Sequence, residues 1–374
     1  QLQRGVGTST NGAGAFGASL NMQTKSFQEK AYAEIANSAG SFGTRKHTLA
    51  FGTGLHNNFE MNARLSSIAS DGFIDRASSN MFGYFFNANY ITKKSQIKFF
   101  AFGGKEKTYQ AWYGTPESRI NGSVSGMQDY IDRNYLTASE ADNLLKSGRT
   151  YNYYTYDNQT DNYAQDHFQL ITNHRLSEAW NLDLNAHYTY GRGYFEEFKP
   201  SADLNTYGIA NSLRSVDVIR RKWLDNDFYG STFALNYVGS QIFKFTFGGA
   251  WNRYVGRHFG VLQDPFPGRE WYRSRSQKTD LNLYAKGNIH LSAAWNAYVD
   301  VQFRTVGYRM LGTADKFLPL DSDNTYSFFN PKFGLTHQIS EKSKENDRHH
   351  FYQTMDEDLF SLIGKKHSVT LQVC

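Results

Sequence analysis

The chain contains long stretches in which apolar and polar residues alternate. In residues 279–304, Leu281 and Leu283 belong to the apolar series, and Asp280 and Asn282 belong to the polar series between them. A repeat of two residues predicts a β-strand with one apolar and one polar face. A short break at residues 292–294 divides the stretch. We therefore expect two strands that form an antiparallel hairpin.

Alternation of this kind fits two architectures. A soluble antiparallel sheet packs its apolar face on a core, whereas a transmembrane barrel turns that face toward lipid. The predicted strands are about ten to thirteen residues long, against about five to six in most soluble sheets. About nine to eleven tilted residues cross a bilayer. No apolar run approaches the roughly eighteen residues of a membrane helix, so a membrane location would require a closed barrel.

The same pattern recurs along most of the chain and predicts about twelve strands, in the layout typical of outer-membrane barrels. Short turns follow positions 55, 92, 176, 238 and 291, whereas longer connections follow 69, 108, 198, 257 and 310. Short turns at one rim and long loops at the other favour an all-β fold, an antiparallel transmembrane β-barrel. The strands are expected at 32–39, 44–55, 58–69, 80–92, 96–108, 163–176, 180–198, 227–238, 241–257, 280–291, 295–304 and 328–338. Girdle residues at the lipid interfaces would be Trp180, Tyr188, Tyr190, Trp251 and Trp295.

Composition agrees with this interpretation and excludes several functions. The 374 residues include 25 Tyr and 29 Phe, and the mean hydropathy of −0.61 fits a barrel with a polar lumen and polar loops. The net charge is +5 with both signs interspersed, so we expect no nucleic-acid partner. The single cysteine, Cys374, cannot form an internal disulfide. No zinc spacing and no nucleophile–base group stands out, so we predict no metal site, no cofactor and no enzymatic activity.

A glycine-rich stretch lies near the N-terminus. Gly12, Gly14 and Gly17 satisfy the spacing of a dinucleotide-binding loop. That motif requires a following helix, but residues 18–23 alternate between small or apolar and polar residues. A tight glycine-rich turn against neighbouring backbone is therefore the better interpretation.

This stretch resembles the end of the plug domain of TonB-dependent outer-membrane receptors. That family closes its plug with an Arg-Gly pair, a glycine-rich segment and a short strand centred on Asn, and the matching residues here are Arg4, Gly5, Gly12, Gly14, Gly17 and Asn21. The local sequence is most similar to receptors of the Bacteroidota. The similarity continues through 72–78, 104–112 and 223–230 and extends to about residue 338.

The resemblance implies a fragment with three parts. Residues 1–24 would be the C-terminal end of the plug, and residues 25–340 would form about twelve of the roughly twenty-two strands of such a barrel. Residues 341–374 break the pattern, and we expect a divergent, non-native or disordered tail after a truncation near Ser340. Open strand edges would then promote aggregation. The family also implies that Arg4 pairs with a carboxylate on the inner barrel wall.

The resemblance implies a receptor that imports a scarce nutrient across the outer membrane of a Gram-negative cell. Iron-siderophore complexes are the first expected substrate, and cobalamin, haem and glycans remain open. The implied partners are the TonB–ExbB–ExbD complex, outer-membrane lipid and the small-molecule ligand. A passive porin-like or adhesin-like barrel is an alternative, although such a pore needs no plug. A secreted enzyme on a β-sandwich would need two converging carboxylates, and no such pair stands out.

The longest polar connection, residues 109–162, is the main candidate for ligand binding. It is rich in aromatic residues, which provide contact surface at low entropic cost. We expect ligand contacts from Trp112, Tyr113, Tyr151, Tyr153, Tyr154 and Tyr156. The alternative is that these side chains pack the loop on itself or belong to the girdle.

Overall fold

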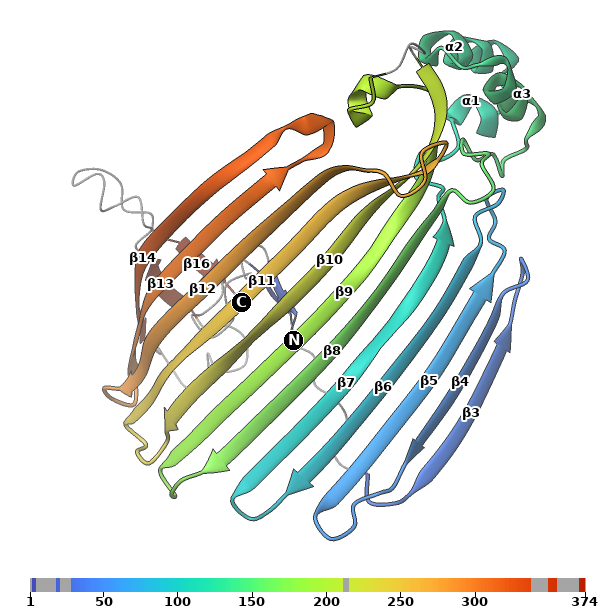
Figure 1. Ribbon diagram of the computed structural model, residues 1–374. Coiled ribbons are helices and arrows are strands. Elements are labelled where there is room, and N and C mark those ends of the chain that lie inside the picture. The colour runs from blue at the N-terminus through green and yellow to red at the C-terminus, as the bar shows by residue number, and fades with distance from the viewer. Residues whose placement is uncertain are drawn as a thin grey trace.

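The protein is dominated by one antiparallel sheet. The computed structural model describes residues 2–4, 18–20, 28–210, 215–337, 349–354 and 370–373. Fourteen strands, β3 to β16, pair in chain order, and a separate two-stranded sheet joins β1 (Leu2–Arg4) and β2 (Ala18–Leu20) (Figure 1). The twelve long strands expected from the sequence are confirmed. They are β3 (Tyr32–Ala39), β4 (Arg45–Gly52), β5 (Phe59–Ser70), β6 (Ser79–Ile91), β7 (Ser95–Tyr109), β8 (Thr160–Arg175), β9 (Trp180–Asp203), β10 (Ser215–Tyr237), β11 (Phe243–Asp264), β12 (Glu270–His290), β13 (Trp295–Thr313) and β14 (Pro319–His337).

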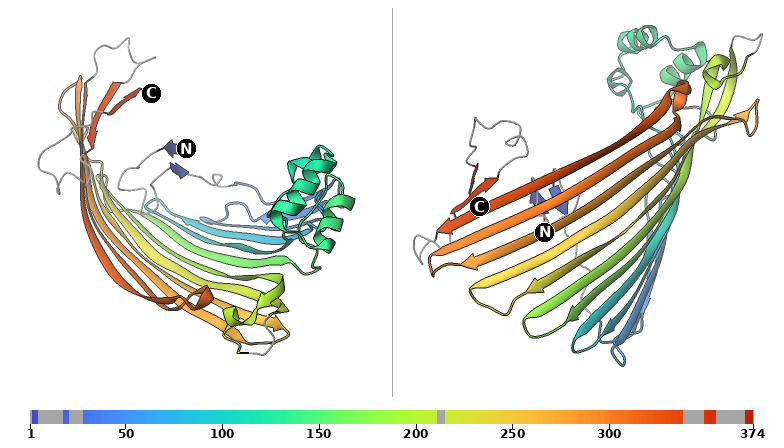
Figure 2. Two further views of the ribbon diagram at one scale, coloured as in Figure 1. Left: turned by 90° about the horizontal axis from the view of Figure 1, so that it is seen from above. Right: turned by 60° about the vertical axis from the view of Figure 1, so that its left-hand side comes forward.

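The sheet curves into an open trough rather than a closed cylinder (Figure 2). Strand β3 lies at one edge, and the short strands β15 (His349–Thr354) and β16 (Thr370–Val373) lie at the other. Strands β1 and β2 lie on the concave side (Figure 2). Of the glycine-rich motif, only Arg4 falls within these strands, and its predicted ion pair, like Gly5, Gly12, Gly14, Gly17 and Asn21, lies outside the described residues.

The two faces of the sheet have opposite character. On β12, Leu281 and Leu283 are 42% and 40% exposed, whereas Asp280 and Asn282 are 1% and 2% exposed. A curved sheet crowds the side chains of its concave face and spreads those of its convex face. The polar series therefore lines the concave face, and the apolar series forms an exposed convex surface, which is the arrangement of a transmembrane barrel wall.

Several strands are longer than the sequence pattern predicted. Strands β9, β10, β11 and β12 have 24, 23, 22 and 21 residues. The loops expected at 199–222, 258–277 and 310–325 are therefore mostly wrong, because the ladder continues through much of each segment. The periodic signal is lost there because both faces carry polar and charged residues, although the backbone pairing persists.

The two rims of the sheet differ. Short turns connect β4–β5, β6–β7, β8–β9, β10–β11 and β12–β13 at one rim. The other rim carries the helices α1 (Glu117–Ile120), α2 (Val124–Asn134) and α3 (Ala138–Lys146), together with the single-turn helices η2 (Leu204–Tyr207) and η3 (Asp315–Phe317) (Figure 1). The first three helices fill much of the connection that the sequence predicted only as polar. Helix α3 begins with a capping box between Thr137 and Glu140.

Within the described ranges, no helix is long and apolar enough to cross a membrane.

Candidate functional site

The connection between β7 and β8 is a small folded unit, called here the helical arm (residues 110–159). Met127, Leu144 and Tyr151 are buried in its own core, and Tyr130 and Ile131 pack against them. Apolar residues from both longer helices thus meet on one side, which gives the arm a fixed shape independent of the sheet.

The helical arm is fastened to the turn between β5 and β6. Arg76 in that turn donates from Nε to the carbonyl oxygen of Tyr154 (3.0 Å) and from Nη2 to that of Asn152 (3.2 Å). The Asn152 side chain donates back to the carbonyl oxygens of Asp75 (2.9 Å) and Gln110 (3.0 Å). A charge-assisted donor shared between two carbonyls fixes the segment that carries Tyr153 and Tyr154.

Four of the six predicted ligand-binding residues meet in one cluster. The ring centroid of Tyr113 lies 4.8 Å from that of Tyr153 and 5.5 Å from that of Tyr154. The ring centroids of Trp112 and Tyr154 are 6.4 Å apart. Trp112 also meets Phe195 on β9 edge-to-face at 5.6 Å. We call these five side chains the aromatic ridge. Because Phe195 is on the concave face by register, the ridge connects the helical arm to the concave wall.

The aromatic ridge offers an accessible surface to a ligand. Trp112 and Tyr113 are 59% and 69% exposed, so neither is needed for the core of the arm. Tyr153 and Tyr154 are half-buried beneath them, and burial raises the pKa of both phenols to about 12, with Glu140 adding to the effect at Tyr153 and Tyr113 at Tyr154. At neutral pH the ridge therefore presents neutral rings with hydroxyl groups.

The other two predicted residues lie elsewhere. Tyr151 is buried in the core of the helical arm, where it packs against Met127 and Leu144. Tyr156 donates its hydroxyl to Oε1 of Glu196 (2.8 Å) and packs on Phe198. Sequence proximity placed these two tyrosines with the others, but the loop geometry separates them from the aromatic ridge.

The loop between β13 and β14 is tied to the sheet beside the ridge. The Nζ atom of Lys222 lies 5.9 Å above the Phe195 ring and 2.7 Å from Oδ2 of Asp315 in the β13–β14 loop. Trp271 donates from Nε1 to the other carboxylate oxygen (2.9 Å). Burial alone would raise the pKa of Asp315, but the hydrogen bonds from Lys222 and Trp271 and the nearby positive charges hold it below its ordinary value. This contact ties the β13–β14 loop to the wall beside the ridge.

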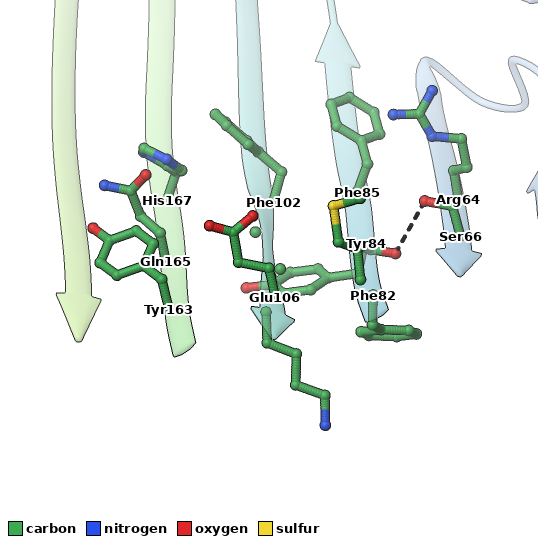
Figure 3. A pocket seen from close by; sticks show the side chains of 15 residues that line it. Arg64, Ser66, Phe82, Tyr84, Phe85, Phe102, Glu106, Tyr163, Gln165 and His167 are labelled. Atoms are coloured by element: carbon green, nitrogen blue, oxygen red, sulfur yellow. Dashed lines mark hydrogen bonds between the residues drawn. The ribbon is translucent and has the colours of Figure 1, made fainter. Parts of the chain in front are cut away.

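The concave wall also contains an open hollow of about 430 Å³ (Figure 3). Arg64, Phe85, Phe102 and His167 lie in one cross-strand row along its border. Phe102 stacks on His167 with centroids 4.6 Å apart, and the Arg64 guanidinium lies 5.9 Å from the Phe85 centroid. The row thus forms a continuous strip of side chains that begins at the Arg64 guanidinium and ends at the His167 imidazole.

The hollow exists because two glycines face each other across β6 and β7. Gly83 pairs with Gly104 in the next row of the ladder, where no side chain fills the concave face. Glu106 and Tyr163 pair one row further on and border the opposite side (Figure 3). The alternation of apolar and polar residues did not predict this hollow. The adjacent Gly103 and Gly104 inside a strand were the available signal, because glycine there often marks a close approach or a gap.

The described residues contain no group of three or more His, Cys, Asp or Glu side chains that could hold a metal ion.

The sheet, with its apolar convex face and polar concave face, has the fold of part of the barrel of TonB-dependent outer-membrane receptors. Among similar solved structures is the ferric-catecholate import receptor Fiu of E. coli K12, with a TM-score of 0.68 at 14% identity, over 95% of this chain and 59% of that one.

Two further structures give the same result. The siderophore receptor PiuA of Acinetobacter baumannii matches with a TM-score of 0.67 at 12% identity, over 94% of this chain and 53% of that one. The ferric yersiniabactin uptake receptor FyuA of Yersinia pestis matches with a TM-score of 0.67 at 11% identity, over 100% of this chain and 54% of that one. The chain thus spans only about half to three-fifths of these receptors. No protein-family model and no curated protein sequence matches the chain.

Proposed function

We propose that the chain is part of a TonB-dependent receptor in the outer membrane of a Gram-negative cell, which imports a small nutrient and catalyses no reaction. Residues 1–24 would be the end of its plug, residues 25–340 part of its barrel and residues 341–374 a divergent tail. Energy for import would come from the TonB–ExbB–ExbD complex, acting through segments outside this chain. An iron-siderophore complex is the proposed substrate class.

The aromatic ridge is the observation that carries this proposal. It combines exposed rings, a rigid mounting on the helical arm and direct contact with the concave wall through Phe195. A passive pore has no use for such a mounted surface above its lumen. Aromatic side chains gain contact area with little loss of conformational entropy, and their hydroxyl groups supply polar contacts. The solved structures of similar fold are described as receptors for ferric catecholate, for siderophores and for ferric yersiniabactin, which supports the substrate class.

Uptake by cells that carry the Trp112→Ala/Tyr113→Ala double variant tests the proposal. Both side chains are exposed, so the variant should reach the membrane in normal amount while ligand affinity falls about tenfold or more, as expected for the loss of two aromatic anchors. The matched control is Tyr135→Ala, which removes a tyrosine that is 91% exposed on the same arm but outside the ridge. Unchanged binding and uptake in the double variant would refute the role of the ridge.

The substrate class needs a separate measurement. Growth of a strain that lacks the gene, with and without complementation, should depend on the gene when an iron-siderophore complex is the only iron source. Growth that depends on the gene only with cobalamin, haem or a glycan would replace the substrate and keep the transporter. Gene-independent growth on all four would overturn import.

A further inference from the structure

The chain enters and leaves the helical arm through a polar junction, called here the arm base (Gln110, Tyr156, Asn158 and Gln159). The backbone N–H of Gln110 donates to the carbonyl oxygen of Gln159 (2.8 Å), and Nε2 of Gln159 donates to Oε1 of Gln110 (3.0 Å). These two glutamines are 1% and 2% exposed. Nε2 of Gln110 also donates to the carbonyl oxygen of Glu196 on β9 (3.1 Å). The two ends of the arm are therefore joined to each other and to the wall.

The carboxylate of Glu196, near the helical rim of β9, links the arm base to the sheet. Its Oε1 accepts hydrogen bonds from the hydroxyl of Tyr156 (2.8 Å) and from Nδ2 of Asn158 (2.6 Å). Its Oε2 accepts from Nε of Arg221 on β10 (2.6 Å). Glu196 is 3% exposed, and burial alone would raise the pKa of its carboxyl, but these three partners hold the pKa below its ordinary value. A buried carboxylate with these donors is charged and fixed in position.

Glu196 directly follows Phe195, which is the wall residue of the aromatic ridge. Successive side chains of a strand point to opposite faces. Phe195 therefore meets Trp112 on the concave face, with ring centroids 5.6 Å apart, whereas Glu196 points to the convex face. Two adjacent residues of β9 thus hold an exposed ring of the ridge and the base of the arm that carries it.

The helical arm has a further attachment at the turn between β5 and β6. There Arg76 donates to two backbone carbonyl oxygens of the arm. A body held at two points can still turn about the line through them, and a third point fixes it. The backbone junction at Gln110 and the Arg76 contact are two such points, and the Glu196 carboxylate supplies the third.

The core of the helical arm is separate from this attachment. It consists of Met127, Leu144 and Tyr151, with Tyr130 and Ile131 packed against them. Loss of the carboxylate should therefore change the angle of the arm on the wall and leave its helices folded.

We propose that Glu196 is a positioning residue for ligand binding, because its carboxylate holds the helical arm at the angle at which Trp112 meets Phe195. This role rests on the proposed function of the aromatic ridge. Glu196 lies on the opposite face of the strand and does not touch the ligand. A ligand that needs the rings of the arm and of the wall together binds only when the arm is docked. Its apparent affinity therefore falls with the fraction of molecules in which the arm is docked.

Equilibrium binding of iron(III)–catecholate and iron(III)–hydroxamate complexes to the full chain in phosphatidylcholine vesicles measures this effect. Glu196→Ala removes the acceptor of all three hydrogen bonds, and we expect about tenfold weaker binding if the arm is then docked about a tenth of the time. Glu196→Gln keeps a carbonyl oxygen for Tyr156 and Asn158 but turns an amide group toward Arg221. It should lower the stability of the protein and keep the affinity within about threefold.

Hydrogen exchange shows whether the arm has moved or unfolded. In Glu196→Ala, exchange should rise at residues 156–160, where the arm base meets the sheet, and stay unchanged in α2 and α3. Glu197→Gln is the matched control, because Glu197 pairs with Arg220 (2.6 Å) and Lys199 (2.9 Å) rather than with the arm base. It should leave both the affinity and the exchange of the arm unchanged.

The possible failures can be told apart. Unchanged affinity in Glu196→Ala, or an equal loss in Glu197→Gln, would overturn the positioning role and leave the ridge as the ligand site. A loss in Glu196→Gln as large as in Glu196→Ala would show that binding follows stability rather than the angle of the arm, with the same consequence. Faster exchange in α2 and α3 would show unfolding of the arm and also overturn the role. Binding of neither iron complex by the unchanged protein would overturn both this role and the proposed substrate class.

Discussion

The convex face provides two leucines of similar exposure at different heights along the wall. Leu283 on β12 and Leu311 on β13 share that face by register and are 40% and 38% exposed. Leu283 lies opposite Phe303 inside the apolar surface, whereas Leu311 lies opposite Arg275, nearer the helical rim. Replacing each with arginine therefore compares two similarly exposed positions at different heights, and the like charge of Arg275 can only add to the cost at Leu311.

The expected difference is large if lipid covers the apolar surface. Lipid contact of the exposed 40% of Leu283 contributes about 1 kcal/mol, given about 1.5–3 kcal/mol for a fully buried leucine. An arginine near the bilayer centre costs about 2–4 kcal/mol, and near the interface about 0–1 kcal/mol. We thus expect Leu283→Arg to lower the free energy of unfolding by roughly 3–5 kcal/mol and Leu311→Arg by about 1 kcal/mol or less.

Chemical unfolding in phosphatidylcholine vesicles, followed by tryptophan fluorescence, measures both values. The same pair in detergent-free buffer is the control for a soluble state, in which exposed substitutions change stability by about 0.5 kcal/mol or less. Equal losses for the two variants in vesicles would refute the assignment of the convex face to lipid. A larger loss for Leu311→Arg would place the membrane at the other end of the strands.

Three further perturbations test the concave side and its loops. Gly104→Ala would place Cβ 2.4 Å from the Phe82 carbonyl oxygen and should lower the free energy of unfolding by about 1–3 kcal/mol in the same assay. Gly83→Ala would place Cβ 3.4 Å from Ser66 Oγ, and its free energy of unfolding should stay near that of the unchanged protein. Asp280 is 1% exposed and accepts a hydrogen bond from Nε of Arg304 (3.0 Å). Replacing either partner with leucine should lower the free energy of unfolding by about 3–5 kcal/mol, and a loss in the double variant equal to the sum of the single losses would contradict a buried pair. The pKa of Asp315 is lower in the folded protein than in the unfolded chain, so its contribution to stability is present above about pH 3.9 and is lost as the pH falls through the folded-state pKa. Hydrogen exchange of the β13–β14 loop should therefore rise in acid, and Asp315→Asn should show no such step.

Much of the fold could be predicted from the sequence because the two faces of each strand meet different environments. Apolar and polar residues therefore alternate along the strand. Around Leu283 the two faces differ, so β12 and β13 were predicted with their connecting turn. At residues 258–277 this contrast disappears, and the segment was predicted as a loop although most of it is paired. The helices of the connection after β7 were missed because local capping and a small core form them, and neither produces a long periodic pattern.

The candidate site was predicted in part for a similar reason. Aromatic composition identified Trp112, Tyr113, Tyr153 and Tyr154, but composition cannot separate a ring on the surface from one in a core. Tyr151 shows this limit, since it fills the core of the helical arm. Phe195 could not be predicted as a ridge residue because only the docking of the arm brings it beside Trp112. The hollow depends on cross-strand register, which alternation along one strand does not specify.

The long strands explain how the outer wall can serve two environments. A bilayer requires about nine to eleven residues of a tilted strand, whereas β9 to β12 have 21 to 24. Since the hydrogen-bonded ladder continues past the apolar surface, the apolar and polar parts of the convex face form one continuous wall. Phe195, Lys222 and the contacts of Asp315 lie on the part beyond the apolar surface, so the wall itself positions Phe195, on which Trp112 of the ridge packs. Because four of the five ridge side chains belong to the helical arm and only Phe195 belongs to the sheet, the ridge should keep its geometry only while the arm stays docked on the wall.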